Sequence, residues 1–504
     1  MSQKRGLLII FIMLMSMIIS ACGGGETAGN GGPILTWITN GISMTNISTP
    51  ERGILATMND KGETGEIFAI PNNTTRVIAC GEQAASPNRR FFAFYIGGIT
   101  GKLYVMDGGA PPKEYDTTAP LTCLGMGTLQ YSPDSNRIGY ITFAGNAVDR
   151  KMPTGTYIQR ETGNGNEQFR YDNVAAFDLN NNTTALVAII ADNNGQFREA
   201  IVSRRASGNT PEEITLIFAD DGCQFRSARV TFAGDNRLAL LMGQECRNNS
   251  TWKFYTVDIS NKIAAVALSG TTGGQFFSDS AQAVLIASSN GENIVFTVQD
   301  GVAIESTNLY VVNMNNIQQS DPLVRYAIMP RQPINRPYDF TNAATPVISS
   351  DGRWLGVVSR TPNNSYSVHV IDLNSPNSNP INISGGIQGD VISAMQFSPN
   401  NQRLFYIAGG HSGNNNSLFY IDLNNALETR VIRGRYTGNI VISPDGNSIA
   451  LLDWQVVDAP RQPNILHLSL INVGNGQSTQ LYSGGTFADN VVSGSRFAYP
   501  LWWR

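Results

Sequence analysis

One short pattern of polar and apolar positions recurs along most of this chain, and it is clearest at Val441–Leu452. A polar turn, Ser443-Pro444-Asp445-Gly446, is followed by the apolar run Ile449–Leu452. Proline fixes φ for the first central position of a β-turn and glycine accepts a positive φ, so the pattern predicts a tight turn that leads into a strand. Further copies of the turn begin at Ser86, Ser132, Ser349 and Ser398, and weaker ones lie near Ser48, Phe232, Phe277 and Ser493.

A second apolar run follows the first in most repeats and ends in Asp or Asn, as in Leu418–Asn425. We expect each such run to be another strand that enters a turn. Related runs are Leu103–Asp107, Val174–Asn180, Phe254–Asp258, Leu309–Asn313 and Val368–Asn374. A period of about 40 to 50 residues with four short strands per unit is the sequence signature of a β-propeller. The prediction is therefore an all-β fold of four-stranded antiparallel blades closed into a ring.

The repeats favour eight blades, with seven as the alternative. The count is weakened at residues 190–220, where two strand-like runs lack the Ser-Pro-Asp turn. The last stretch, 484–504, supplies one strand without the rest of a unit, whereas the first unit, near 48–80, could take an additional early strand. We therefore expect the two chain ends to share one blade, so that no long sheet edge stays unpaired.

The first residues have the features of an export signal. Lys4-Arg5 precede the apolar run Leu7–Ile19, and small residues follow it. Ile19-Ser20-Ala21-Cys22 resembles a bacterial lipobox, in which the cysteine receives the lipid and becomes the mature N-terminus. The resemblance implies a lipoprotein signal peptide at 1–21, a lipidated Cys22, a flexible tether at 22–33 and a propeller domain at 34–504. An ordinary signal peptide is the alternative.

Such an anchor predicts an extracytoplasmic location in the cell envelope. Two or three acyl chains hold a protein stably on a bilayer, where one chain does not, so the expected first partner is membrane lipid through Cys22. The chain has 504 residues, of which 15% are charged, and a net charge of −4. It shows no Lys/Arg cluster with interleaved aromatic residues, so we expect no nucleic-acid partner. We also expect a monomer.

Four cysteines remain for the mature chain, an even number in an oxidising compartment. In a propeller the linkers between blades and the loops between second and third strands open on the same face. Cys80 and Cys123 precede successive Ser-Pro turns, and Cys223 and Cys246 flank the first two strands of one repeat. We predict the disulfides Cys80–Cys123 and Cys223–Cys246, with four free buried thiols as the alternative.

The two paired signatures resemble the repeat of TolB-type and related WD-repeat-like bacterial β-propellers over nearly the whole mature chain. The resemblance implies the fold and no single function, since such propellers serve as scaffolds, as ligand binders and as appendages of peptidases. Two departures matter. The tether leaves no room for the α/β domain that precedes the TolB propeller, and no Gly-x-Ser-x-Gly motif of a hydrolase follows the repeats.

Candidate catalytic or metal-binding residues are scarce. His369 and His467 lie inside expected strands, where packing explains them, and His411 lies in the loop Gly409–Gly413, where it could bind a ligand. Three scattered histidines without carboxylates at ligand spacing do not predict a zinc site. The turn role explains Asp351-Gly352 and Asp445-Gly446, which lack the further oxygen ligands that calcium requires. We therefore expect no metal and no cofactor, and catalysis is the less favoured expectation.

Loops of unequal length are the better place to look for a binding surface. Insertions fall at Gly145–Tyr171, Asn290–Ser306, Ala327–Thr345 and Trp454–Asn464, and strand direction places them on one face. Arg and aromatic side chains are enriched at protein-binding surfaces. The binding candidates are Arg150, Tyr157, Arg331, Arg336, Tyr338, His411, Trp454 and Arg461.

The function that we expect is that of a non-catalytic binding or scaffold propeller whose loop-rich face recognises a protein, a glycan or another envelope component. The alternative is a hydrolase or lyase whose active-site residues converge from several blades on the central channel, where two carboxylates could cooperate. A structural subunit of an envelope assembly is a third possibility.

Overall fold

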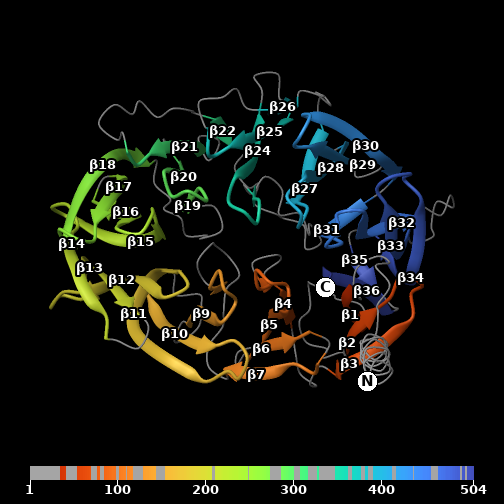
Figure 1. Cartoon of the computed structure of the whole chain (residues 1–504), viewed down its shortest axis with the longest axis horizontal. Helices are drawn as coiled ribbons and strands as arrows, with labels where there is room; N and C mark the ends of the chain where they lie inside the picture. The colour runs from red at the N-terminus through yellow and green to blue at the C-terminus, as the bar shows by residue number, and fades with distance from the viewer. Residues whose placement is uncertain are drawn as a thin grey trace, which may run out of the picture.

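The computed structural model describes residues 34–40, 54–69, 76–79, 84–97, 102–108, 110–116, 129–142, 154–206, 210–247, 249–272, 285–299, 307–315, 326–328, 347–360, 366–375, 381–383, 390–410, 416–434, 436–455, 464–488, 491–493 and 496–503. These residues form 36 strands, all in antiparallel sheets. The sheets follow one another around a ring (Figure 1). In the sheets that do not contain the chain ends, the first strand lies nearer the centre than the last. This arrangement is the β-propeller that the repeats predict.

Both ends of the chain meet in one four-stranded sheet. Its order is β3-β2-β1-β36, so the last strand takes the inner position and the first three strands follow it outward. The register between β1 and β36 runs from Ile34 opposite Trp503 to Asn40 opposite Arg496. The expectation that the two ends share a blade is thereby confirmed. The strands are β1 (Ile34–Asn40), β2 (Ile54–Met58), β3 (Thr64–Ala69) and β36 (Arg496–Trp503).

Three further sheets contain four strands in simple succession, and a fourth adds a short fifth strand at its outer edge. The first comprises β4 (Arg76–Ala79), β5 (Phe91–Gly97), β6 (Lys102–Asp107) and β7 (Lys113–Asp116). The second comprises β15 (Cys223–Phe232), β16 (Arg237–Cys246), β17 (Ser250–Asp258) and β18 (Ile263–Thr272). The third comprises β27 (Asp390–Phe397), β28 (Arg403–Gly410), β29 (Asn416–Asp422) and β30 (Leu427–Gly434). The five-stranded sheet comprises β31 (Tyr436–Ile442), β32 (Ser448–Gln455), β33 (Asn464–Asn472), β34 (Ser478–Ala488) and β35 (Val491–Ser493).

A seven-stranded sheet replaces two of the units expected from the sequence. Its strands are β8 (Leu129–Tyr131), β9 (Arg137–Thr142), β10 (Gly155–Glu161), β11 (Glu167–Leu179), β12 (Thr183–Ala191), β13 (Phe197–Ala206) and β14 (Glu212–Phe218).

Strand β11 belongs to two neighbouring groups at once. Its first half pairs with β10, as with Glu167 opposite Arg160, and its second half pairs with β12, as with Leu179 opposite Thr184. The run Val174–Asn180 therefore does not take the third-strand role that its sequence signature predicted. It continues an outer strand of one group into the inner strand of the next.

The remaining sheet has eight strands, in which β22 and β24 join two groups through a single pair, Ile328 opposite Ser359. Its strands are β19 (Leu285–Ala287), β20 (Asn293–Gln299), β21 (Thr307–Asn313), β22 (Tyr326–Ile328), β23 (Val347–Ile348), β24 (Trp354–Arg360), β25 (Tyr366–Asp372) and β26 (Ile381–Ile383).

Apolar side chains from facing sheets pack between neighbouring groups. Between β17 and the sheet that contains β20 and β21, the Phe296 ring lies 4.8 Å from the Phe254 ring and 5.0 Å from the Tyr310 ring, both nearly parallel to it. Stacked aromatic rings contribute beyond the area that they bury. The strand aromatics are thus core, as the sequence predicted for Tyr140, Phe405, Tyr406 and Trp354, of which Trp354 is only partly buried.

The recurrent turn is held by one set of hydrogen bonds. The Ser443 hydroxyl donates to Asp445 Oδ1 at 2.5 Å and accepts the Ser448 amide at 2.9 Å, while Asn447 N–H donates to the same carboxylate oxygen at 3.0 Å. Gly446 has a φ of 72°, as the turn chemistry requires. The hydroxyl-to-carboxyl or hydroxyl-to-amide bond recurs in four other turns, at Ser86, Ser132, Ser288 and Ser349.

These turns also join successive groups around one face of the ring. Arg237 Nη1, at the start of β16, donates to the carbonyl of Met314 at 2.6 Å, and Asn293 Nδ2, at the start of β20, donates to the carbonyl of Leu373 at 2.7 Å. Arg89 Nη2 donates to the carbonyl of Trp503 at 2.7 Å and so ties a turn to the closing strand. We call this the turn face.

Candidate functional site

Strand order assigns the unequal connections to the face opposite the turn face. The segments 143–153, 300–306 and 456–463 join a second strand to a third, and 329–346 joins an outer strand to the next inner strand. In antiparallel groups these connections start from the same strand ends. We call this side the loop-bearing face.

Most of the predicted binding residues lie outside the described residues. This holds for Arg150, Arg331, Arg336, Tyr338, His411 and Arg461. Trp454 is part of β32, where its backbone lies opposite Leu466. For all seven residues, a role in binding on the loop-bearing face stays a prediction.

The prediction that Tyr157 is a binding residue is wrong. The sequence placed it in a polar surface insertion, but residues 155–161 form β10 and Tyr157 is 0% exposed. Its ring lies 4.7 Å from that of Phe177, and its hydroxyl donates to Gln159 Oε1 at 3.2 Å. Burial raises the pKa of Tyr157, so the phenol stays neutral. A residue enclosed in this way is part of the core and cannot contact a macromolecular partner.

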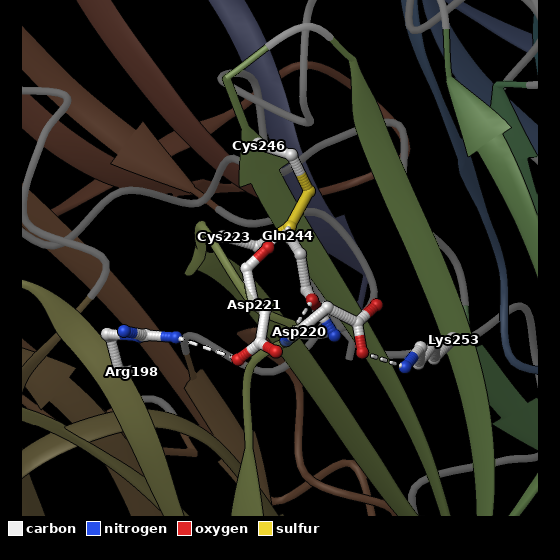
Figure 2. Close-up of a disulfide and its surroundings, with 7 residues drawn as sticks. All are labelled: Arg198, Asp220, Asp221, Cys223, Gln244, Cys246 and Lys253. Carbon is white, nitrogen blue, oxygen red and sulfur yellow. Dashed lines mark hydrogen bonds and ion pairs between the residues drawn. A yellow bond between two sulfur atoms is a disulfide. The ribbon is translucent and has the colours of Figure 1, made fainter.

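The Cys223–Cys246 disulfide is present, as predicted (Figure 2). It links the first residue of β15 to the last residue of β16, which lie directly opposite each other. The predicted pair Cys80–Cys123 and the lipidation residue Cys22 lie outside the described residues. Because β15 follows an outer strand and β16 leads into a third strand, the disulfide closes a corner of the loop-bearing face.

Charged residues surround this disulfide. Lys253 Nζ lies 2.5 Å from Asp220 Oδ1, and Arg198 Nη2 lies 3.8 Å from Asp221 Oδ1 (Figure 2). The Asp220 amide donates to Oε1 of the fully buried Gln244 at 2.9 Å, which fixes the backbone between β14 and β15. The side chain of Asp221 is fully exposed.

This disulfide corner, made of Arg198, Asp220, Asp221, Cys223, Cys246 and Lys253, can present charges in a fixed geometry. It offers hydrogen-bond and ion-pair partners to a ligand but no activated nucleophile. Sequence reasoning found the cysteines and missed the charged residues, because Asp220 and Asp221 belong to no motif. Their position directly before a predicted disulfide cysteine was the available signal.

One grouping of Ser, Asp and His side chains has the residue types of a hydrolytic site. Ser469 Oγ donates to Asp453 Oδ2 at 2.9 Å, and Asp453 lies opposite His467 in the register of β32 and β33. A hydrolytic triad needs the imidazole to accept the serine proton and the carboxylate to hold the imidazole. Here the serine proton goes to the carboxylate instead, so the arrangement does not activate Ser469.

Metal ligands do not gather within the described ranges, where no group of three or more His, Cys, Asp or Glu side chains could hold an ion. Across the same described ranges, no helix has the length and apolarity needed to cross a membrane.

Comparisons with known proteins bear on the fold. No protein-family model matches the sequence, and no curated protein matches it. Among solved structures, a eukaryotic initiation factor is similar with a TM-score of 0.50 and 14% identity, over 93% of this chain and 98% of that one. The Dos1 propeller matches with a TM-score of 0.40 and 13% identity, over 75% of this chain and 92% of that one. An oligogalacturonate lyase from Vibrio parahaemolyticus matches with a TM-score of 0.35 and 10% identity, over 90% and 87% of the two chains. At these identities the likeness concerns the fold alone, and it is the strand order that makes this chain a β-propeller.

Proposed function

We propose that this chain is a lipid-anchored, extracytoplasmic β-propeller that binds a protein, a glycan or another envelope component through its loop-bearing face, without catalysis. The observation that carries the proposal is the disulfide corner, where a covalent link holds exposed charges in place on that face. A crosslink of this kind suits an oxidising compartment outside the cytoplasm. We propose that the protein acts as a monomer without a cofactor.

The anchor half of the proposal rests on Cys22 and the tether. A Gly-rich segment such as 22–33 has an r.m.s. end-to-end distance of about 20 Å, so it would keep β1 close to the bilayer surface. The remaining rim of the ring would then stay accessible to partners in the envelope.

We further propose nine blades, in place of the eight or seven favoured by the repeats. Supporting this number, the two halves of β11 divide the seven-stranded sheet into two groups of four. The single pair between β22 and β24 divides the eight-stranded sheet in the same way. The other five sheets each supply one group.

The binding half is tested by crosslinking on detergent-solubilised envelopes of the source cells. The bait is the full chain, as the wild type, as Asp220→Asn with Asp221→Asn, and as the matched control Glu114→Gln. Glu114 lies on the outer strand β7, away from the disulfide corner, and forms an ion pair with Lys102 of β6. We expect a specific crosslinked partner with the wild type and the control, and a severalfold loss with the double variant. Equal capture by all three baits would remove the disulfide corner from the binding surface.

The anchor half has its own test. Cys22→Ser should move the protein from the membrane fraction to the soluble extracytoplasmic fraction, because the lipid-bearing thiol is lost. A wild-type protein that is already soluble, or a variant that stays on the membrane, would contradict the anchor and leave the binding surface unaffected.

A further inference from the structure

A polar group is enclosed between two sheets on the loop-bearing side of the ring. Asp453 on β32 and His467 on β33 are directly opposite each other, and Ser469 is opposite Leu451. Leu451 packs against Phe405 and Ile407 of β28, so this side of the five-stranded sheet faces the sheet β27–β30. His467 is 8% exposed and Ser469 is 2% exposed.

The hydrogen bonding of this group is incomplete. Asp453 Oδ2 accepts from Ser469 Oγ at 2.9 Å, but Asp453 Oδ1 and both imidazole nitrogens of His467 are buried without a hydrogen-bond partner. Each unsatisfied buried polar group costs about 1–3 kcal/mol, and such groups are uncommon in native proteins. Directly opposite residues on one face of an antiparallel pair have Cβ atoms about 5 Å apart, so a side-chain rotation suffices to join them.

We propose that Asp453 and His467 form a proton-operated latch between β32 and β33, within the sheet β31–β35. Proton uptake by the His467 imidazole draws it into an ion pair with Asp453 Oδ1, and proton loss releases it. Histidine is the side chain whose ordinary pKa, about 6.5, places this change between pH 5 and 8. The Ser469 hydroxyl holds the carboxyl in position through its other oxygen.

Among the residues that the structure describes, His467 supplies the opposite charge beside Asp453. Burial raises the pKa of Asp453, and the opposing influences are the Ser469 hydroxyl and the His467 charge. The charged residues of β30 point to the other side of their sheet. Glu428, Arg430 and Arg433 are opposite Ile421, Phe419 and Ser417, which share one side of β29, and Ile421 and Phe419 pack on the β24–β25 side. Tyr420 of β29 packs in the same interface. Arg403 of β28 is on the same side of its strand as Phe405, and its guanidinium carbon lies 4.9 Å from the centroid of the Tyr420 ring. The backbone of Tyr436 on β31 is opposite Asp453 in the register. The other neighbours are apolar: Phe405, Ile407, Leu418, Val431, Ile432, Ile440 and Ile442. On β34, Ser483 is opposite His467.

The position of the latch gives it a consequence beyond packing. Residues 456–463 connect β32 to β33, so Asp453 and His467 stand at the base of one of the unequal connections of the loop-bearing face. A proton-dependent contact there couples the acidity of the compartment to the strand ends that carry this connection. This inference does not depend on the identity of any ligand.

The first test follows the histidine ring signals of the full mature chain by NMR between pH 5 and 9. Asp453→Asn should weaken proton binding at His467, because the replacement removes the opposite charge that faces the imidazole. The proton affinity of His369 should not change, because it is buried in a different sheet pair. An unchanged His467 titration in the Asp453→Asn protein, or a His467 that takes up no proton above pH 5, would overturn the latch.

A second test measures thermal unfolding of Asp453→Asn, His467→Gln and the double variant. Their effects should be non-additive at pH 5.5 and additive at pH 8.5, with His369→Gln as the matched control that shows no pH-dependent coupling to Asp453→Asn. A coupling of equal size at both pH values would indicate a fixed structural contact and refute a proton-operated one.

Discussion

Replacing Ser443 by alanine should destabilise the ring far more than the loss of one hydroxyl on a surface. Ser443 is 0% exposed, and its hydroxyl both donates to Asp445 and accepts the Ser448 amide. A hydrogen bond to a charged group contributes about 1.5–3 kcal/mol, and an unsatisfied buried amide costs about 1–3 kcal/mol. We therefore expect Ser443→Ala to lower the free energy of unfolding by about 2–4 kcal/mol at pH 7.

The penalty should also depend on pH. Burial tends to raise the pKa of Asp445, but hydrogen bonds from Ser443 and Asn447 outweigh it and lower that pKa. A carboxyl whose folded pKa lies below its unfolded value stabilises the fold above the ordinary pKa of about 3.9, and this contribution disappears as the pH falls through the folded value. The part of the Ser443→Ala penalty that comes from Asp445 should thus shrink as the pH is lowered toward 3.

Urea unfolding of the wild type, Ser443→Ala and the control Ser478→Ala across this pH range measures both effects. Ser478 is exposed on β34, so its replacement should change stability by less than about 0.5 kcal/mol. A Ser443→Ala penalty no larger than that of the control, or one that does not change between pH 7 and pH 3, would refute this account of the turn.

Three further perturbations test the core, the disulfide and the closure of the ring. Phe296→Ala should cost about 3–5 kcal/mol, since the ring is fully buried between two stacked aromatic neighbours; thermal unfolding that hardly changes would contradict this packing. Joint replacement of Cys223 and Cys246 by alanine should lower the free energy of unfolding by about 3 kcal/mol, since the bridge has a sequence separation of 23. Reduction should then no longer change the stability of the variant, whereas it destabilises the wild type. Deleting residues 496–504 should leave the inner edge of β1 unpaired and cause aggregation, seen by light scattering, whereas a deletion that stays monomeric would show that β36 is dispensable.

The sequence predicted those parts of the fold that depend on local chemistry. The Ser-x-Asp turns satisfy their own hydrogen bonds within six residues, so Ser443–Ser448 could be read without knowing what surrounds it. The disulfide Cys223–Cys246 was accessible for a similar reason, because it bridges two consecutive strands of one repeat.

Features that depend on pairing between distant segments could not be predicted from the sequence. Val174–Asn180 has the composition of a third strand, and only its partners in β10 and β12 show that it joins two groups. Tyr157 lies in a segment that is polar in sequence, but Thr184, 25 residues away, donates to Gln159 Oε1 at 2.9 Å, so a polar strand is satisfied inside the core. A linear pattern cannot distinguish such a buried polar network from a solvated loop.

Because β1 pairs with β36, the order of strands around the ring does not depend on where the chain begins. A peptide that fused residue 503 to residue 34 would bridge neighbouring strands of one sheet, and new ends could be opened at the exposed hairpin 192–196 between β12 and β13. Such a circular permutant would keep every strand neighbour while moving the chain ends to another sector of the circumference. With the anchor that we propose, the native chain order would determine which sector of the ring lies next to the membrane.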